Sequence, residues 1–233
     1  VNIATIEDPV EYDIEGINQI QVNAKTNLTF AKGLRSILRQ DPDIILVGEM
    51  RDLETAETSI HAALTGHLVF STLHTNDATG TVPRLVDMGI NPNSIGPSLN
   101  LAIAQRLVRK VCQNCSVKQK ITVDTLEKFK KILATLPPAV KPPKLAENAE
   151  IAVPKGCEKC NNSGYKGRMA IFEIFRMTPE MKKFVMANAT NESAIREFAI
   201  KQGMTTMGHD GVIKILNGLT TLEEVEGTVG KLE

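Results

Sequence analysis

The alternation of apolar runs with helical segments in the first third of the chain constrains its fold most strongly. Ile44–Val47 is a short apolar run typical of a strand buried on both faces, and residues 67–73 form a second strand pattern. Between them, residues 53–64 have the pattern of a helix, with Asp52 placed to cap its start and Gly66 to end it. This order of elements predicts an α/β fold with a parallel sheet.

The segments before and after this unit extend the pattern. Residues 1–12, VNIATIEDPVEY, alternate and then turn at Asp8, which predicts a strand that ends in acidic residues. Residues 29–39 predict a helix whose N-cap is Thr29. A further helix is expected from about Asp77, after the second apolar strand.

The composition limits the class of protein. With 42 % hydrophobic residues among 233, the chain can bury a substantial core. Lys plus Arg equals Asp plus Glu at 27 each, so the charge gives no support for nucleic-acid binding. No apolar run reaches about 18 residues, the length that a membrane-spanning helix needs. No signal-peptide pattern opens the sequence, which favours the cytoplasm. Because the first residues already read as a strand, we expect the sequence to begin inside a longer protein.

The pattern changes near residue 108. Two cysteine pairs there bracket a predicted helix at about 123–135 and a Pro-rich loop, and after residue 176 the chain reads as short helices. We therefore expect three parts: an α/β core at 1–107, a tetracysteine module at 108–170 and a small helical region at 171–233.

Acidic residues or histidines follow three successive predicted strands. Glu7 ends the first, Glu49 follows the second and His74 follows the third. Because the carboxyl ends of parallel strands lie at one edge of a sheet, these side chains could meet around one ligand. A carboxylate after an apolar strand suits a nucleotide site, where it orients water or supports Mg²⁺.

Each of these residues also has an ordinary structural interpretation. A single acid after a strand is usually a solvated loop residue or a helix cap, and Asp52 is read as a plain N-cap. His61 lies in the middle of a predicted helix, where a histidine is normally a packing or surface residue, and His67 could simply begin a strand. The occurrence at three successive strand ends is much less expected by chance.

Three segments together resemble one protein family. They are TIEDPVEY, the long block LRSILRQDPDIILVGEMRDLETAETSIHAALTGHLVFSTLHTNDA, and CEKCNNSGYKGR. They are similar to the Asp box, the Walker B and His box region, and the cysteine segment of the secretion ATPases of type II secretion and type IV pilus assembly. The resemblance covers nearly the whole chain and includes GLTTLEEV near its end.

The resemblance implies a RecA-like P-loop ATPase core that uses ATP and Mg²⁺. By this resemblance Glu49 is the catalytic glutamate that orients or deprotonates the attacking water, Glu7 helps to position it, and His74 senses the γ-phosphate. Arg35, Arg39 and Arg51 are candidates for stabilising the transferred charge, including across a subunit boundary. The remaining candidates for binding the nucleotide are Asp8, Glu11, Gly48 and His67.

Two departures from the pattern of P-loop ATPases matter. Gly48 stands where many of them have the Asp that supports Mg²⁺, as is common in this family, and Glu7 or Asp8 could partly replace that acid through water. In P-loop ATPases the backbone N–H groups and the Lys of a G-x-x-x-x-G-K-[ST] loop hold the phosphates. No such loop occurs in this sequence. The chain is therefore expected to be the C-terminal part of such an ATPase and to be inactive alone.

The only four cysteines form two C-x-x-C pairs. Cys112 and Cys115, followed by Cys157 and Cys160, could supply four thiolates to a tetrahedral Zn²⁺. The spacer at 116–156 is longer than the usual ~15–20 residues, so it should hold a helix of its own. One alternative is reduced thiols without a metal. The other is disulfides, and a cytosolic setting disfavours disulfides. In the family this module marks assembly and secretion ATPases, and retraction relatives generally lack it.

The full expectation is a motor ATPase that assembles as a homo-hexamer and drives pilus assembly or type II secretion. Its partner would be an inner-membrane platform protein, so it would lie at the cytoplasmic face of that membrane, attached only through partners and without nucleic acid. The alternative from another class is a zinc-bearing interaction module of a secretion- or conjugation-type ATPase, without independent catalysis.

Overall fold

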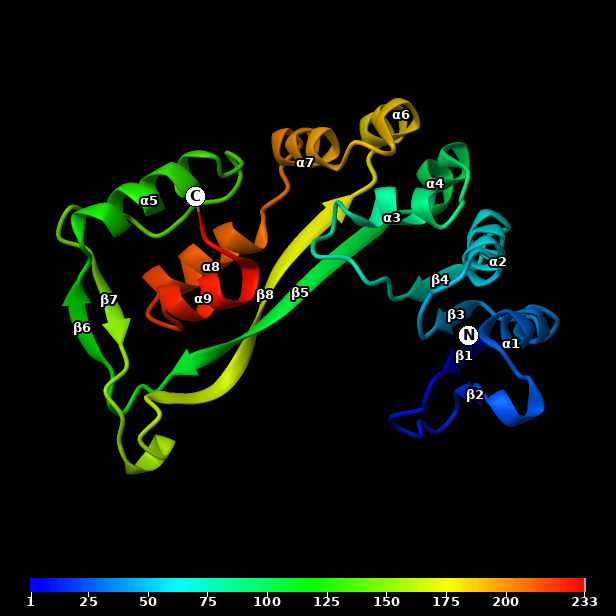
Figure 1. The fold of residues 1–233 in the computed structure, drawn as a ribbon, viewed down its shortest axis with the longest axis horizontal. Coiled ribbons are helices and arrows are strands. Elements are labelled where there is room, and N and C mark those ends of the chain that lie inside the picture. Colours follow the sequence, from blue (N-terminus) through cyan, green and yellow to red (C-terminus); the bar gives the residue numbers. More distant parts are fainter. Residues whose placement is uncertain (233) are drawn as a thin grey trace. The chain divides into compact units, whose positions relative to one another are not determined.

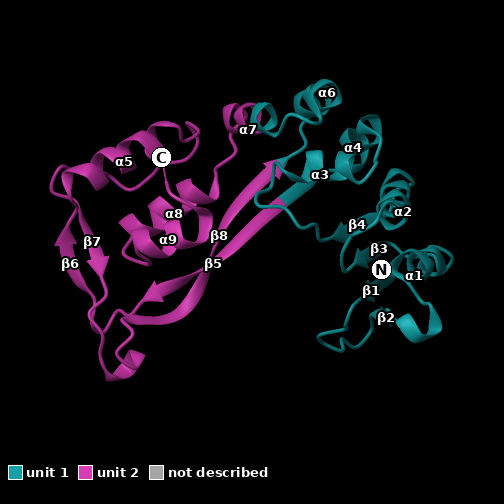
Figure 2. Cartoon of the chain, viewed as in Figure 1, with its two compact units in different colours: residues 1–102, 176–195 teal, residues 103–175, 196–233 magenta. Residues whose placement is uncertain are grey.

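The computed structural model describes residues 1–232 and confirms the α/β fold with a parallel sheet. The chain forms two compact units (Figure 2). Unit 1 comprises residues 1–102 and 176–195, and unit 2 comprises residues 103–175 and 196–233. The sequence predicts three parts, at 1–107, 108–170 and 171–233. This division stays a prediction.

Unit 1 contains a four-stranded parallel sheet (Figure 1). Its order is β2-β1-β3-β4, with β1 at Ile3–Glu7, β2 at Asn18–Gln21, β3 at Ile44–Val47 and β4 at Leu68–Ser71. The register aligns Ile6 with Val47 and Val47 with Ser71, so the carboxyl ends of three strands lie at one edge. The prediction of a common strand edge is thus confirmed.

Two helices pack on one face of this sheet. Helix α1, Phe30–Ile37, begins where the Thr29 hydroxyl accepts a hydrogen bond from the backbone N–H of Lys32, as predicted. Helix α2, Leu53–Leu64, begins at Asp52, whose carboxylate accepts the N–H of Thr55. The core beneath them contains Ala4, Ile6, Leu34, Ile37, Ile45, Val47 and Ala62.

The helix after β4 begins later than the sequence pattern predicts. Helix α3 is Thr81–Asp87, whereas we expected a start near Asp77. The Asp77 carboxylate accepts the hydroxyl of Thr79 and the N–H of Gly80, so these residues form a turn before the helix. The other helices of unit 1 are α4, Pro92–Ser98, and α6, Pro179–Asn188, which pack together, and the 3₁₀ turn η1 spans Ala24–Thr26.

Unit 2 contains two small sheets and several helices. Strands β5, Leu101–Val111, and β8, Tyr165–Arg176, form one sheet, and β6, Val117–Lys120, pairs antiparallel with β7, Glu150–Val153. The helices are α5, Val123–Ala134; α8, Met207–Leu216; and α9, Leu222–Val229, with the 3₁₀ turn η2 at Glu158–Cys160. Helix α7, Glu192–Lys201, begins in unit 1 and ends in unit 2. The predicted helix in the spacer and the short helices after residue 176 are confirmed, whereas strands β5, β6 and β7 were not predicted.

Helix α8 covers the outer edge of β8. The Asp210 carboxylate accepts the N–H of Phe172 at 2.8 Å, and the Lys214 ammonium donates to the carbonyl of Ala170 at 2.8 Å. These contacts satisfy backbone groups that would otherwise invite pairing with another strand. The ring Nε2 of His209 lies 2.8 Å from the Thr135 hydroxyl at the end of α5, so α8 also holds the spacer between the cysteine pairs.

No helix among residues 1–232 is both long and apolar enough to cross a membrane.

Candidate active site and candidate metal centre

Hydrogen bonds join the end of β1 to the end of β3, and the end of β3 to the segment after β4. The N–H of Gly48 donates to the carbonyl of Ile6 at 2.8 Å, and the Thr72 hydroxyl donates to the carbonyl of Gly48 at 2.7 Å. A Cβ at position 48 would lie 3.3 Å from the Cα of Glu7 and 3.2 Å from the Ile6 carbonyl oxygen, closer than side chains usually approach. Glycine therefore lets β1 and the segment before Glu49 approach closely.

Glu49 is the centre of a small charged cluster at this edge. Its Oε2 accepts a hydrogen bond from Nε of Arg51 and lies 3.1 Å from Nε2 of His74. The side chain of Glu49 is only 12 % exposed, whereas those of Arg51 and His74 are 68 % and 70 % exposed. The structure thus brings together the carboxylate and the histidine that the sequence places after neighbouring strands.

The environment of Glu49 favours its charged form. Partial burial acts to raise its pKa, but the hydrogen bonds from His74 and Arg51 and their charges outweigh burial and hold the pKa below its usual value. The carboxylate is therefore ionised at neutral pH. Both partners use Oε2, and within residues 1–232 Oε1 accepts no hydrogen bond, so this oxygen can accept one from water.

Glu7 has a separate set of partners. Its Oε1 accepts hydrogen bonds from the hydroxyl of Thr5 and, at 3.0 Å, from the amide nitrogen of Gln19. Among the described residues it bonds to neither Glu49 nor His74, although its strand is the direct neighbour of β3. Sequence reasoning missed Thr5 and Gln19; the alternation of Gln19 and Gln21 with apolar residues was the signal that could have revealed β2.

The other predicted nucleotide ligands are more scattered. Asp8 and Glu11 are exposed on the loop after β1. His67 precedes β4, at the opposite edge of the sheet from Glu49, and its Nδ1 lies 2.9 Å from the carbonyl of Ala62. The structure therefore does not bring His67 together with Glu49.

The predicted arginines differ in their contacts. Arg35 forms an ion pair with Glu54 at the start of α2, and Arg39 donates to the hydroxyl of Ser36 at 3.3 Å. Both are exposed. Of the three arginines, only Arg51 contacts a predicted catalytic residue.

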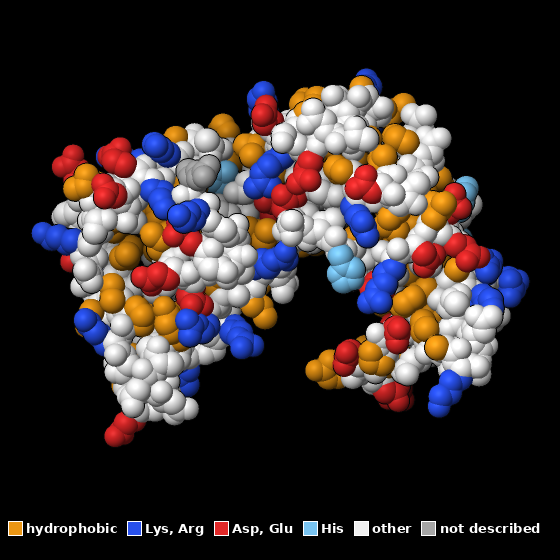
Figure 3. All heavy atoms as spheres, viewed as in Figure 1, with side chains coloured by type: hydrophobic (Ala, Val, Ile, Leu, Met, Phe, Trp, Pro, Cys, Tyr) orange, Lys and Arg blue, Asp and Glu red, His pale blue; other side chains and the backbone are white. Residues whose placement is uncertain are grey.

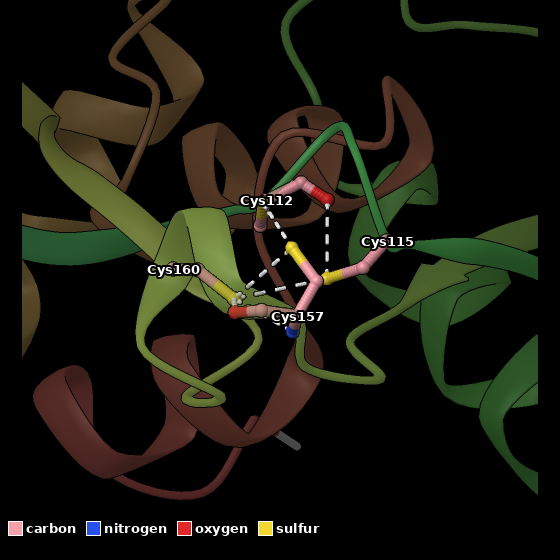
Figure 4. Close-up of side chains that lie close together, drawn as sticks. All are labelled: Cys112, Cys115, Cys157 and Cys160. Atoms are coloured by element: carbon pink, nitrogen blue, oxygen red, sulfur yellow. Dashed lines mark hydrogen bonds between the residues drawn. The ribbon is translucent and has the colours of Figure 1, made fainter.

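The four cysteines come together in unit 2 (Figure 4). Their sulfur atoms all lie within 4.8 Å of one another, with 4.0 Å between Cys112 and Cys157, 3.9 Å between Cys115 and Cys160, and 3.7 Å between Cys157 and Cys160. Sulfur atoms around a tetrahedral Zn²⁺ with bonds of about 2.3 Å are about 3.8 Å apart. All four thiols are free, so disulfides do not explain the cluster.

Backbone and side-chain donors point at two of these sulfurs. The N–H groups of Cys157 and Gly164 donate to the sulfur of Cys160, and the amide of Asn114 donates to that of Cys157. Burial acts to raise the pKa of Cys160, yet the backbone donors lower it to about 6, whereas burial raises the pKa of Cys115 to about 11. A donor-rich cluster of four thiols fits a metal that binds thiolates.

The sequence is similar to proteins of known type. The family model described as "Type II/IV secretion system protein" matches residues 1–227. The chain is 47 % identical over 224 residues to the "Type IV pilus assembly ATPase PilB" of Thermus thermophilus, which covers 96 % of this chain and 24 % of that protein. It is 46 % identical over 224 residues to the "Type II secretion system protein E" of Aeromonas hydrophila, covering 96 % of this chain and 42 % of that protein. The chain thus spans less than half the length of these relatives.

Solved structures share the fold. The pilus retraction motor PilT with bound ADP superposes with a TM-score of 0.66 at 29 % identity, covering 97 % of this chain and 52 % of that one. The ATPase DotB of Legionella pneumophila superposes with a TM-score of 0.64 at 22 % identity, covering 97 % of this chain and 50 % of that one, which supports the fold alone.

Proposed function

Because the chain belongs to the type II/IV secretion system protein family, we propose that it is the C-terminal part of a motor ATPase that hydrolyses ATP to drive type IV pilus assembly or type II secretion. The observation that carries this proposal is the contact of Glu49 with His74 at the carboxyl edge of the parallel sheet. Ligands bind at this edge in open α/β sheets. The relatives named above as an ATPase and as a motor with bound ADP support the same chemistry.

In the proposed mechanism each residue at the carboxyl edge of the sheet has a role in hydrolysis. Glu49 accepts a hydrogen bond from the attacking water through Oε1 and takes its proton, while Arg51 and His74 hold Oε2. Glu7 helps to position that water, and His74 reports whether a γ-phosphate is present. Gly48 allows the approach of β1 that brings Glu7 to the same edge.

The nucleotide and its metal would lie beside this edge. Bound Mg²⁺ supplies neutralisation of phosphate charge. Asp8, Glu11 and Glu7 are the nearby acids that could hold metal-bound water. Arg35, Arg39 and His67 remain candidates for contacting a nucleotide held by a neighbouring subunit, since their side chains have no contact with Glu49.

We propose that the four cysteines hold one Zn²⁺. Four thiolates complete a tetrahedral site and leave no position for water or substrate, so this metal would be structural. It would join the turn after β5 to the turn before β8 and so close the long spacer between the two cysteine pairs. The cysteine pairs also favour an assembly or secretion motor over a retraction motor, by resemblance.

We further propose a homo-hexamer at the cytoplasmic face of the inner membrane, attached through a platform protein. Figure 3 shows basic and acidic side chains interspersed on the visible face, which supports a motor without nucleic-acid contacts. A second candidate function is a zinc-bearing interaction module without catalysis, and the thiol cluster is the observation that favours it. The two functions are separated by ATP hydrolysis in the full-length protein.

Residues 1–233 alone should not hydrolyse ATP. Without a phosphate-binding loop nothing holds the γ-phosphate near Glu49, and a base without a positioned substrate gives little catalysis. Phosphate release and nucleotide affinity of the purified chain would be measured. Micromolar ATP binding, or a steady turnover that Glu49→Gln abolishes, would show a phosphate site elsewhere in these residues.

His74→Ala should weaken the distinction between ATP and ADP. If the ring senses the γ-phosphate, the ratio of the two Kd values in the full-length protein should move toward one by about tenfold, the effect of one hydrogen bond to a charged group. His61→Ala, on the exposed face of α2, is the matched control and should leave the ratio unchanged. Equal discrimination in both variants would make His74 a partner of Glu49 only.

A further inference from the structure

The side-chain amide of Gln19 joins the Glu7 carboxylate to the loop that follows β1. Its Nε2 donates to Oε1 of Glu7 at 3.0 Å and to the carbonyl of Tyr12 at 3.1 Å. Its Oε1 accepts the N–H of Ile14 at 2.8 Å. One amide thus contacts a proposed catalytic carboxylate and two points of the loop between β1 and β2.

This pattern determines which way the amide faces. Both hydrogens of the NH₂ group are used on oxygen acceptors, and the amide oxygen faces a backbone donor. A flipped amide would place its oxygen against a carboxylate and a carbonyl, and its NH₂ group against an N–H. Gln19 therefore has a single favourable orientation in the folded chain, as a group that positions a neighbour must have.

The strand register explains why Gln19 can act on Glu7. Residue 19 pairs with Thr5 on the neighbouring strand β1, and Glu7 lies two residues further along the same face. Thr5 donates its hydroxyl to the same oxygen, Oε1, that receives the amide of Gln19. Within residues 1–232 the second oxygen, Oε2, accepts no hydrogen bond, so it remains available to water.

From these contacts we propose that Gln19 is a positioning residue for ATP hydrolysis: it orients the Glu7 carboxylate and links that orientation to the loop at 8–17. The proposal rests on the role of Glu7 given above. Two donors on Oε1 restrict rotation of the carboxylate and leave Oε2 as the oxygen that can accept a hydrogen bond from water. A shift of the loop would reach Glu7 through one side chain, because Tyr12 and Ile14 bind the same amide.

The first test replaces the amide by groups of similar size in the full-length protein. Gln19→Glu and Gln19→Met both remove the two N–H donors, and either should lower kcat by about 10–100-fold while the KM for ATP changes by less than about threefold. Gln40→Glu is the matched control, because Gln40 is exposed and lies near the amino end of β1, where its carbonyl accepts the side-chain amide of Asn2. It should keep kcat within about threefold of the parent.

The pH dependence separates positioning from a general loss of structure. Gln19→Glu places a second carboxyl group beside Glu7, and protonation of that group restores one donor and removes the repulsion between like charges. The kcat of this variant, relative to the parent, should therefore recover as the pH falls from 8 to about 5.5. Gln19→Met cannot be protonated, so its deficit should stay constant. Identical pH profiles for the two variants would overturn the proposal.

A double-mutant cycle shows whether Gln19 acts through Glu7. Once Glu7→Gln has lowered turnover, adding Gln19→Met should cost little more, within about twofold. Costs that multiply would show that Gln19 acts by another route and overturn the inference, while the proposed function would stand. Near-parental turnover of Glu7→Gln alone would instead remove the proposed role of Glu7, and the inference with it.

Discussion

Glu49→Gln in the full-length protein is expected to lower ATP turnover by roughly 10²–10⁴-fold, the usual contribution of a general base. The amide keeps the shape of the side chain but cannot take a proton from water. ATP should still bind, because the change leaves the strand edge and its backbone contacts intact. Turnover is measured by phosphate release, and binding by nucleotide titration.

A matched control tests whether the effect belongs to the strand end. Glu57→Gln makes the same chemical change on the exposed side of α2 and should leave turnover within about twofold of the parent. A Glu49→Gln protein with near-normal turnover would exclude Glu49 as the base. The charged cluster with Arg51 and His74 would then be an ion-pair network without a role in the chemistry.

Zinc removal is the second change expected to have a large effect. Structural zinc sites contribute on the order of 10 kcal/mol or more to folding of small modules, so the metal-free module should lose its ordered structure. Metal analysis of the purified protein should give about one zinc per chain, and Cys157→Ser should lose it. Hydrogen exchange should then rise over residues 108–170, while the sheet of unit 1 keeps its protection.

The matched control for this loss is Gln113→Ser. Gln113 is exposed and lies between the first two cysteines, but it offers no ligand to the cluster. This variant should keep both zinc and protection. A metal-free protein with four titratable thiols and unchanged thermal stability after chelation would contradict a structural zinc.

Much of unit 1 could be predicted because its signals are local. The apolar run at 44–47 and the capping residues Thr29 and Asp52 each determine an element through neighbours close in sequence. The start of α3 was misjudged because the Asp77 side chain caps a turn as readily as a helix, and the sequence shows the capping residue but not which of the two follows.

Strand β5 escaped prediction because its two faces do not differ in polarity. Leu101, Ile103 and Leu107 are exposed, whereas the smaller Ala102 and Ala104 are buried. An alternation between large and small apolar residues does not show the period of two that marks a half-buried strand. The short strands β6 and β7 are stabilised mainly by pairing with each other across the spacer, which local pattern cannot reveal.

In the candidate site, too, some contacts could be predicted from the sequence and others could not. Glu49 and His74 could be paired from the sequence, because the carboxyl ends of adjacent parallel strands must share an edge. The contacts of Glu7 with Thr5 and Gln19 could not, since they depend on the pairing and register of β2, which the sequence pattern did not establish.

Steady-state phosphate release by the full-length protein, with Mg²⁺ and ATP, tests whether Glu49 and its neighbours form the catalytic edge of an ATPase. We expect turnover that requires Mg²⁺ and that Glu49→Gln suppresses. A folded full-length protein that loads zinc but releases no phosphate above background would contradict it. That result would leave the zinc-bearing interaction module as the function that these residues support.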